Sequence, residues 1–259
     1  MNKFHVIIPA RMHSTRLPHK MTLSVGKYPL IIQTAKQAQK SEAYQVTVAT
    51  DHLDIADLCK DHDINAILTK NTHTSGTERL VEAAEILELA DNEIVINIQG
   101  DEPLIEPVLI NELARFLTAK LTNFATIAHK IDNEEEIFNP HVTKVVLDND
   151  SNALYFSRSP IPFYRDGFTE RNHNFQLPPK LDILRHVGVY AYHVAFLKQY
   201  SKMLVSPLEQ TEMLEQLRAL YNGYKIAVLV SDIIPATGVD TLEDLQRIRQ
   251  LLHDNNNEV

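Results

Sequence analysis

The segment at residues 10–20 gathers side chains that could neutralise several phosphate groups. Its cations and hydroxyls are Arg11, Ser14, Thr15, Arg16 and Lys20. Forked guanidinium groups, a compact ammonium and hydroxyls suit a triphosphate, whose transferred and departing oxygens both carry charge. The chain has only seven glycines and neither GxxxxGK[ST] nor GxGxxG, so phosphate binding here must rely on side chains. A solvated basic turn is the alternative.

Two carboxylates in widely separated motifs are the candidates for a metal site. Asp101 follows the apolar run 94–98, where an unpaired carboxylate would be costly, and Asp240 follows the last predicted strand. Carboxylates from two strand ends could hold Mg²⁺ on nucleotide phosphates, with phosphate oxygens and water filling the other positions. Helix capping is the competing explanation for Asp240, because Asp-Thr before Leu-Glu-Asp-Leu is an ordinary helix start.

Both sets of polar residues are expected at one edge of a doubly wound, mostly parallel α/β sheet. Nearly apolar runs predict strands at residues 4–10, 45–50, 65–69 and 93–99. Apolar residues at i, i+3 and i+4 predict helices between them, at 29–40, 53–62 and 77–89. Ligands bind beyond the carboxyl ends of such strands, so the four loops that follow them predict one polar pocket.

After about residue 119 the pattern predicts strand next to strand. The later strands are expected at 124–130, 142–148, 152–157, 185–193 and 225–230, with a hairpin turn at 148–151. A long loop is expected at 159–180, and helices at 207–221 and 241–253. We therefore expect a single domain over residues 1–259, with a smaller antiparallel insertion at about 120–200 that forms a homodimer surface.

Composition narrows the class of protein. The chain has 259 residues, 44% of them hydrophobic and 23% charged, as in ordinary globular proteins. Its one cysteine, Cys59, excludes an internal disulfide and a cysteine-based zinc site, which favours the cytoplasm. The net charge of −9 argues against nucleic-acid partners, and no apolar run approaches the ~20 residues of a membrane helix. Residues 1–41 hold seven basic and no acidic side chains, which favours a small anionic ligand.

Several longer motifs occur in order along nearly the whole chain. They include Val6-Ile-Ile-Pro-Ala-Arg, Thr74-Ser-Gly-Thr-Glu-Arg, Asn97-Ile-Gln-Gly-Asp-Glu-Pro, Tyr155-Phe-Ser-Arg-Ser-Pro-Ile-Pro, Arg185-His-Val-Gly-Val-Tyr, Leu214-Glu-Gln-Leu-Arg and Thr237-Gly-Val-Asp-Thr. In these motifs the chain resembles the 3-deoxy-manno-octulosonate cytidylyltransferases, also called CMP-Kdo synthetases. The resemblance implies a fold of the nucleotide-diphospho-sugar transferase type.

The resemblance also implies a reaction. CMP would pass from CTP to the anomeric hydroxyl of 3-deoxy-manno-octulosonate, or of its 8-amino-3,8-dideoxy analogue. Pyrophosphate would be released, and the product would serve lipopolysaccharide inner-core synthesis. Mg²⁺ is the implied cofactor.

The resemblance assigns roles to residues at matching positions. Those of the nucleotide-phosphate loop are Arg11, Ser14, Arg16 and Lys20, and those near cytosine and ribose are Thr50, Ser75, Gly76 and Thr77. The implied magnesium ligands are Asp101 and Asp240. The implied sugar-side residues are Arg79, Gln99, Arg158, His186, Tyr190, Glu215 and Gln216. Catalysis would rest on Lys20, Asp101, Asp240 and Arg11.

Departures from the family pattern and other functions stay open at this point. The family usually reads Leu-Pro-Gly-Lys-Pro where this chain has His19 for glycine and Met21 for proline, and Tyr28 interrupts a later Gly-Lys-Pro. The phosphate loop can therefore follow a different path. His186 is a possible general base, although a histidine in a strand is more often a hydrogen-bonded structural residue. The alternatives are a cytidylyltransferase for another acidic sugar, such as N-acetylneuraminate, and a non-catalytic nucleotide-binding module.

Overall fold

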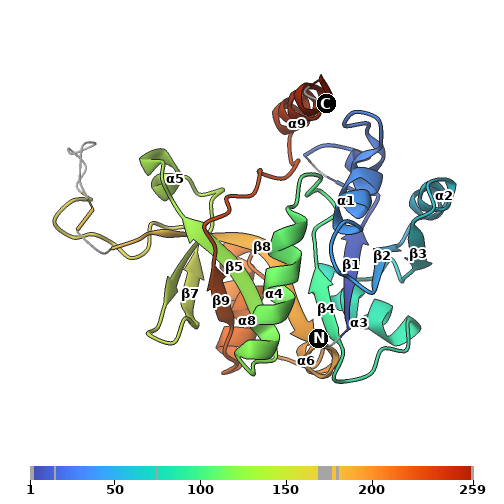
Figure 1. Cartoon of the computed structure of the whole chain (residues 1–259). Coiled ribbons are helices and arrows are strands. Elements are labelled where there is room, and N and C mark those ends of the chain that lie inside the picture. The colour runs from blue at the N-terminus through green and yellow to red at the C-terminus, as the bar shows by residue number, and fades with distance from the viewer. Residues whose placement is uncertain (1–2, 15, 74, 169–176, 179–180, 258–259) are drawn as a thin grey trace.

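Figure 1 shows a computed structural model of the chain, which describes residues 3–14, 16–73, 75–168, 177–178 and 181–257. The strands are β1 (Phe4–Ala10), β2 (Gln45–Thr50), β3 (Asn65–Leu68), β4 (Ile94–Asn97), β5 (Phe124–Lys130), β6 (Lys144–Leu147), β7 (Ala153–Ser157), β8 (Leu184–His193) and β9 (Ala227–Val230). The helices are the short 3-10 helix η1 (Lys20–Thr22), α1 (Leu30–Ala38), α2 (Leu53–Asp61), α3 (Gly76–Ile86), α4 (Pro107–Ala119), α5 (Glu134–Phe138), α6 (Val194–Tyr200), α7 (Pro207–Glu212), α8 (Gln216–Tyr221) and α9 (Leu242–Asn257).

The described strands form one mixed sheet. Its order is β3-β2-β1-β4-β8-β5-β9, and β6 and β7 pair beside this path. Strand β1 runs parallel to both β2 and β4, and β2 runs parallel to β3. This confirms the predicted α/β class and brings the carboxyl ends of four strands to one edge.

Side chains of the central strands divide between two apolar cores. Strand β1 is buried along its whole length. Its Val6 and Ile8 pack in the core that α1 and α4 cover, whereas Ile7 packs on the opposite face with Leu80 of α3. Successive strand side chains point to opposite faces, so burial on both faces requires the continuous apolar run that the sequence shows. Figure 1 shows α4 crossing in front of the sheet.

Strand β8 makes the sheet mixed. It lies between β4 and β5 and runs antiparallel to both. The segment expected as an antiparallel insertion therefore contributes β5 and β8 to the central sheet. The predicted hairpin at 148–151 is confirmed between β6 and β7, and β6 joins the sheet where Lys144 pairs with Arg185.

Helical regions differ from the sequence prediction in two ways. Helices α4, α5 and α6 were not predicted, although Leu109, Ile110, Leu113 and Leu117 of α4 form a buried stripe at helical spacing. The helix predicted at 207–221 is split into α7 and α8, because Met213 takes a left-handed conformation with a φ of 53°. The split turns the chain so that the residues after Met213 face the sheet edge.

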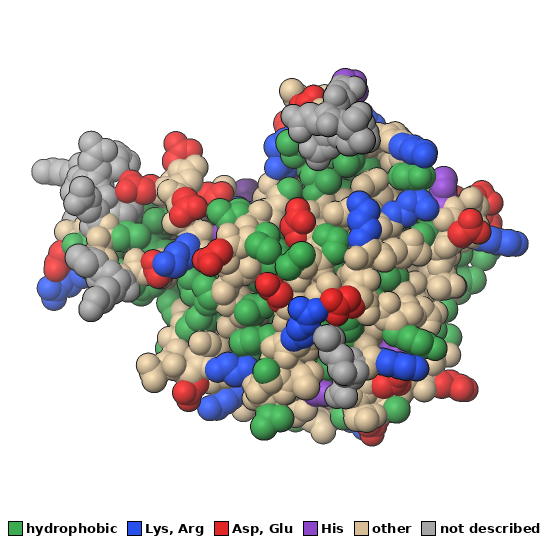
Figure 2. Space-filling model, viewed as in Figure 1, with side chains coloured by type: hydrophobic (Ala, Val, Ile, Leu, Met, Phe, Trp, Pro, Cys, Tyr) green, Lys and Arg blue, Asp and Glu red, His purple; other side chains and the backbone are tan. Residues whose placement is uncertain are grey.

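Charge on the visible surface is mixed rather than segregated. Figure 2 shows acidic and basic side chains interspersed over this face. No helix in the part of the chain that the structure describes is both long and apolar enough to span a membrane.

Candidate active site

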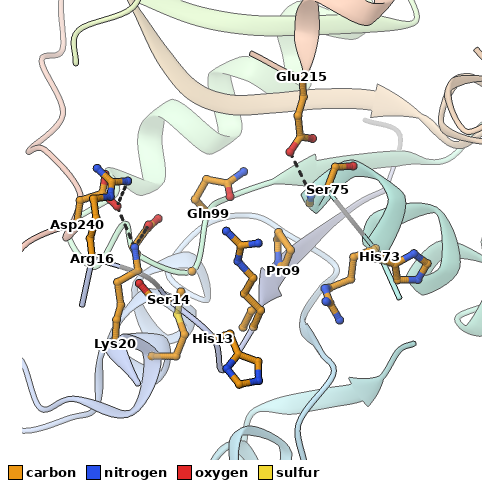
Figure 3. Close-up of a pocket in the computed structure, with 17 residues that line it drawn as sticks. Pro9, His13, Ser14, Arg16, Lys20, His73, Ser75, Gln99, Glu215 and Asp240 are labelled. Carbon is orange, nitrogen blue, oxygen red and sulfur yellow. Dashed lines mark hydrogen bonds and ion pairs between the residues drawn. The ribbon is translucent and has the colours of Figure 1, made fainter. Parts of the chain in front are cut away.

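A cavity of about 250 Å³, called here the first cavity, lies at the carboxyl ends of β1 and β4. Figure 3 shows Lys20 and Asp240 at one end of it, Glu215 at the other, and Gln99 between them. Three of the four predicted loops line the cavity: those after β1 and β4 and the one that leads into α3. The loop after β2 does not line it, which corrects that part of the prediction.

At one end of the first cavity, an ammonium group joins the two carboxylates predicted as metal ligands. Lys20 Nζ donates to Asp101 Oδ2 at 2.6 Å, to Asp240 Oδ1 at 3.0 Å and to the Val239 carbonyl at 3.0 Å. Burial acts to lower the pKa of Lys20, but the two carboxylates outweigh burial and raise that pKa above its ordinary value. Lys20 is therefore a charged ammonium held between Asp101 and Asp240. Asp101 is 81 residues and Asp240 is 220 residues after Lys20 in the chain. The sequence predicts that these three side chains meet at one edge of the sheet.

The rest of the basic loop surrounds the same cavity. Arg16 Nη2 lies 2.9 Å from Asp240 Oδ1, and both side chains are about half exposed. Arg11 and Ser14 also line the cavity. Thr15 lies outside the described residues. The loop therefore presents its predicted cations to one space.

The other end of the first cavity is formed by the start of α3 and Glu215. The carboxylate of Glu215 accepts hydrogen bonds from the backbone N of Gly76 and of Thr77, each at 3.2 Å, and from Thr77 Oγ1 at 2.7 Å. Ser75 caps the helix by accepting from the backbone N of Glu78. A carboxylate is stabilised at a helix N-terminus, where backbone N–H groups are unpaired. Gly76 and Ser75 line the cavity, whereas Thr77 is used by Glu215.

Arg79 forms a buried contact at the rim of the first cavity. Its Nη2 lies 2.8 Å from Asp51 Oδ2, its Nη1 donates to Thr69 Oγ1 at 2.5 Å, and only 4% of the residue is exposed. The predicted sugar-side residues Arg79 and Glu215 thus line the first cavity. Neither lines the larger cavity that adjoins the first one, where the other predicted sugar-side residues lie.

Thr50 lines neither cavity. It is fully buried at the end of β2. Its hydroxyl accepts from the backbone N of His52, and its carbonyl accepts from the backbone N of Thr69. The structure thus places Thr50 behind the neighbouring residues, and a direct nucleotide contact by its side chain finds no support in this geometry.

A second cavity of about 830 Å³ adjoins the first. The two share the lining residues Arg16, Gln99, Asp101 and Asp240. Four predicted sugar-side residues line only the second of these two spaces: Arg158, His186, Tyr190 and Gln216. The aspartate pair and Arg16 therefore stand at the junction of a small cationic space and a larger polar one.

An amide group in the second cavity has an unused donor. Tyr190 Oη donates to Gln216 Oε1 at 3.1 Å, and burial raises the pKa of Tyr190 well above its ordinary value. Gln216 is only 3% exposed, and its Nε2 has no hydrogen-bond partner among the described residues. A buried amide nitrogen without a partner costs free energy, so this donor is suited to a ligand oxygen.

His186 is neutral in this environment. Its Nε2 lies 3.0 Å from Thr126 Oγ1, and burial lowers the pKa of His186 to about 3. A base with so low a pKa has little affinity for a proton near neutral pH. The hydrogen-bonded structural role weighed from the sequence is therefore favoured over general-base catalysis.

The departures from the family pattern leave Lys20 in the site. His19 has a φ of 55° and a ψ of 25°, the left-handed region in which glycine is favoured. The loop thus keeps a glycine-like conformation at His19. Met21 is buried against Gly100, where a Cβ would lie 3.0 Å from Met21 Sδ. Tyr28 packs edge-on against the ring of His62, away from these contacts.

Comparison with known proteins now identifies the family. A family model described as cytidylyltransferase matches residues 5–226. The chain belongs to the cytidylyltransferase family. Among curated cytidylyltransferases, the 3-deoxy-manno-octulosonate cytidylyltransferase of Neisseria meningitidis serogroup A is 49% identical over 249 residues, which cover 96% of this chain and 98% of the relative. That of Herminiimonas arsenicoxydans is 49% identical over 247 residues, covering 95% and 98%.

Solved cytidylyltransferase structures agree with the fold. The structure of CMP:2-keto-3-deoxy-manno-octonic acid synthetase complexed with CTP matches with a TM-score of 0.88 and 37% identity, covering 98% of this chain and 99% of that one. A cytidylyltransferase from Leptospira borgpetersenii matches with a TM-score of 0.58 at 15% identity, which shows a shared fold alone. The predicted family, fold class and enzyme class are therefore confirmed.

Some residues of this cytidylyltransferase site were not singled out from the sequence. Asp51 pairs with Arg79, and it could have been noticed as the polar end of Val48-Ala-Thr-Asp. Glu102 lines the second cavity, where burial and the neighbouring Asp101 raise its pKa to about 8. Lys144 and Glu212 contact Arg158 without lining the second cavity, and no local sequence pattern marks them.

Proposed function

We propose that this cytidylyltransferase transfers CMP from CTP to the anomeric hydroxyl of 3-deoxy-manno-octulosonate or its 8-amino analogue, releasing pyrophosphate. The names of the relatives and of the CTP-bound structure support this substrate pair. The observation that carries the proposal is the meeting of Lys20, Asp101 and Asp240 at the junction of two cavities. The first cavity suits the nucleotide, and the second suits the acceptor sugar. The CMP-sugar product would serve lipopolysaccharide synthesis.

The two cavities can hold the reactants so that they meet at their junction. The triphosphate would lie against Arg11, Arg16 and Lys20 in the first cavity. The acid sugar would lie in the second cavity, with its carboxylate on Arg158 and a hydroxyl on Gln216 Nε2. The sugar hydroxyl could then approach the α-phosphorus from the side opposite the departing pyrophosphate. Positioning and charge neutralisation account for catalysis without a covalent enzyme intermediate.

We also propose Mg²⁺ as the cofactor, held by Asp101 and Asp240. Two carboxylate oxygens within 3.0 Å of the Lys20 nitrogen already share one cation. Among the described residues, no three acidic, histidine or cysteine side chains are placed to hold a metal ion together. This donor set fits Mg²⁺, which is commonly bound by one or two carboxylates together with substrate phosphates.

The Lys20 ammonium would be displaced from its position between Asp101 and Asp240 by a metal ion bound to them. When bound, the ion would neutralise phosphate charge and make the sugar hydroxyl more acidic. Lys20 competes with any divalent cation for Asp101 and Asp240, because its ammonium already occupies the space between the two carboxylates. Once released from that pair, Lys20 could turn to the phosphates. Arg16 would keep one cation beside Asp240 during the exchange.

We further propose that the enzyme works as a cytoplasmic homodimer. The exposed apolar side chains Leu154 and Phe163 lie on and just after the β6–β7 hairpin, at 61% and 64% exposure. Burial of such side chains between two copies would remove apolar surface from water. Light scattering after gel filtration tests this: a dimer mass is expected, and a monomer mass at micromolar concentration would contradict it.

Pyrophosphate release tests the substrate assignment. The protein is incubated with CTP, Mg²⁺ and each of three acceptors: the parent sugar, its 8-amino analogue and N-acetylneuraminate. Release with one or both octulosonates, and none with N-acetylneuraminate, is expected. Release with N-acetylneuraminate alone would favour the other acid-sugar activity. CTP binding without release from any acceptor would favour a non-catalytic module.

A further inference from the structure

We infer that Lys144 and Glu212 are positioning residues that fix the Arg158 guanidinium for an acidic acceptor. Neither residue lines the second cavity. Both side chains contact the backbone of Arg158, and the backbone carbonyl of Glu212 accepts a hydrogen bond from Arg158 Nε. Because the proposed function places the acceptor carboxylate on Arg158, this inference rests on that proposal.

Lys144 is an ammonium group buried among carbonyl oxygens. The residue has no exposed surface, and its Nζ donates to the carbonyls of Asn139 at 3.0 Å, Val142 at 2.6 Å and Arg158 at 2.6 Å. All three acceptor residues line the second cavity. Burial lowers the pKa of Lys144. Such burial of a cation is costly, so three carbonyls directed at one ammonium form a specific clasp.

Glu212 holds the same residue from the other side. Its Oε2 accepts from the backbone N of Arg158 at 2.9 Å, and its Oε1 accepts from Ser157 Oγ at 2.6 Å. The carbonyl of Glu212 also accepts from Arg158 Nε at 2.7 Å. Glu212 is the last residue of α7, so this contact depends on where that helix ends.

The contacts leave Arg158 little freedom. Its backbone N and carbonyl are both bound, its Nε is bound to Glu212, and its Nη1 donates to the Pro140 carbonyl at 2.9 Å. Only Nη2 has no protein partner among the described residues. With two backbone contacts and two contacts from the guanidinium itself, Arg158 presents its remaining donor in one direction, which lowers the entropy lost when a carboxylate binds.

The contrast with Arg16 supports a positioning role. Arg16 reaches the junction of the cavities with a half-exposed side chain and one ion pair. The guanidinium of Arg158 donates to two neutral backbone carbonyls, which fix its direction. Neither carbonyl neutralises the positive charge of the guanidinium. The charge of Arg158 is therefore available to an anionic ligand. These facts distinguish a preorganised receptor from a structural ion pair.

Lys144→Met and Glu212→Gln test the inference against a matched control. Lys130→Met removes a lysine from β5, which pairs with β8 as β6 does, and Lys130 forms a half-exposed ion pair with Asp182. For each variant, the KM for CTP and the KM for the acceptor sugar are measured separately, together with CTP affinity by calorimetry. We expect the acceptor KM to rise about 10- to 100-fold in Lys144→Met and Glu212→Gln, because small displacements of binding groups cost up to roughly that factor. CTP affinity should stay within about twofold, and Lys130→Met should match the wild type.

The outcomes separate this inference from the proposed function. Equal rises in the KM for CTP and the KM for the acceptor would overturn it, and so would a fall in kcat with neither KM changed, since a merely structural role does not single out the acceptor. An unchanged acceptor KM in a folded Glu212→Gln variant would also overturn it, even where Lys144→Met fails to fold. If the wild-type protein itself releases no pyrophosphate with either octulosonate, the proposed function fails first, and this inference falls with it.

Discussion

Lys20 of the first cavity and Arg158 of the second are held by different kinds of contact. In the first cavity, charged side chains satisfy one another: Lys20 is paired with Asp101 and Asp240, and Arg79 with Asp51. In the second, Arg158 is held by carbonyls, and the Gln216 amide keeps an unused donor. Pairs between side chains can be exchanged for pairs with a ligand, whereas backbone contacts hold a group in place.

This difference suggests a division of labour. The first cavity can exchange its internal ion pairs for contacts with a metal ion and a triphosphate. The second cavity is already arranged for its ligand and needs little movement. The following substitutions test each side of that comparison.

Asp101→Asn and Asp240→Asn break the junction that both cavities share. Each removes one of the two carboxylates proposed to hold the metal, so turnover should fall by about 10³-fold or more at saturating Mg²⁺. Steady-state kinetics measure the loss, and circular dichroism confirms folding. Asp61→Asn, at the exposed end of α2, serves as the control. Near-wild-type turnover in either junction variant would remove that aspartate from the metal site.

Lys20→Ala tests the exchangeable cation of the first cavity. We expect turnover to fall roughly 10²- to 10³-fold, or about 3–4 kcal/mol of transition-state stabilisation, as for the loss of one preorganised electrostatic donor. The acceptor KM should change little, because Lys20 does not line the second cavity. A loss of less than threefold would mean that Lys20 only neutralises the aspartates.

His186→Gln probes the second cavity through the pH dependence of stability. The unfolded histidine takes up a proton near its ordinary pKa of 6.5, but the folded one does so only near 3. Between these values the unfolded state binds more protons, so acidification destabilises the wild type by up to about 1.4 kcal/mol per pH unit through this group. Urea unfolding from pH 7 to pH 4 should show a shallower loss in the variant. Parallel curves would contradict the buried, neutral histidine.

His19→Gly tests the backbone of the loop that delivers Lys20. Relief of a left-handed conformation gains about 1–2 kcal/mol, and the freer unfolded glycine costs roughly 0.5–1 kcal/mol. We therefore expect a small increase in the free energy of unfolding, measured by urea titration. Destabilisation would show that the imidazole makes contacts that outweigh the strain.

The parallel half of the fold was predictable because its strands are buried on both faces. Residues 4–10 and 45–50 were predicted with the bounds that the structure shows. The loops after the strands predicted at 4–10 and 93–99 led to Lys20 and Asp101. The meeting of Asp101 and Asp240 at Lys20 followed from a general property of parallel sheets, whose separate strand ends lie at one edge. In this half of the fold, the local hydrophobic pattern and the general rule for parallel sheets gave the same prediction.

The later, antiparallel half of the fold was less predictable because distant contacts override local pattern. The residues at 207–221 have helical periodicity, yet Met213 is left-handed and Glu215 reaches the start of α3, 139 residues earlier in the chain. The clasp on Arg158 joins β6, the end of β7 and the end of α7. The partners of the Glu212–Arg158 contact are 54 residues apart and those of the Glu215–Gly76 contact are 139 apart, so no local pattern contains both partners of either contact. The position of β8 between β4 and β5 also depends on strands that lie far from it in the sequence, so no local pattern predicts it.

Binding of Mn²⁺ to the nucleotide-free protein tests the central claim most directly, since Lys20 and a divalent ion are proposed to compete for Asp101 and Asp240. Electron paramagnetic resonance of free Mn²⁺ measures the affinity of the wild type, of Lys20→Met and of Lys20→Met combined with Asp101→Asn. The account predicts tighter binding in Lys20→Met than in the wild type, and loss of that gain in the double variant. Equal or weaker binding in Lys20→Met would contradict it.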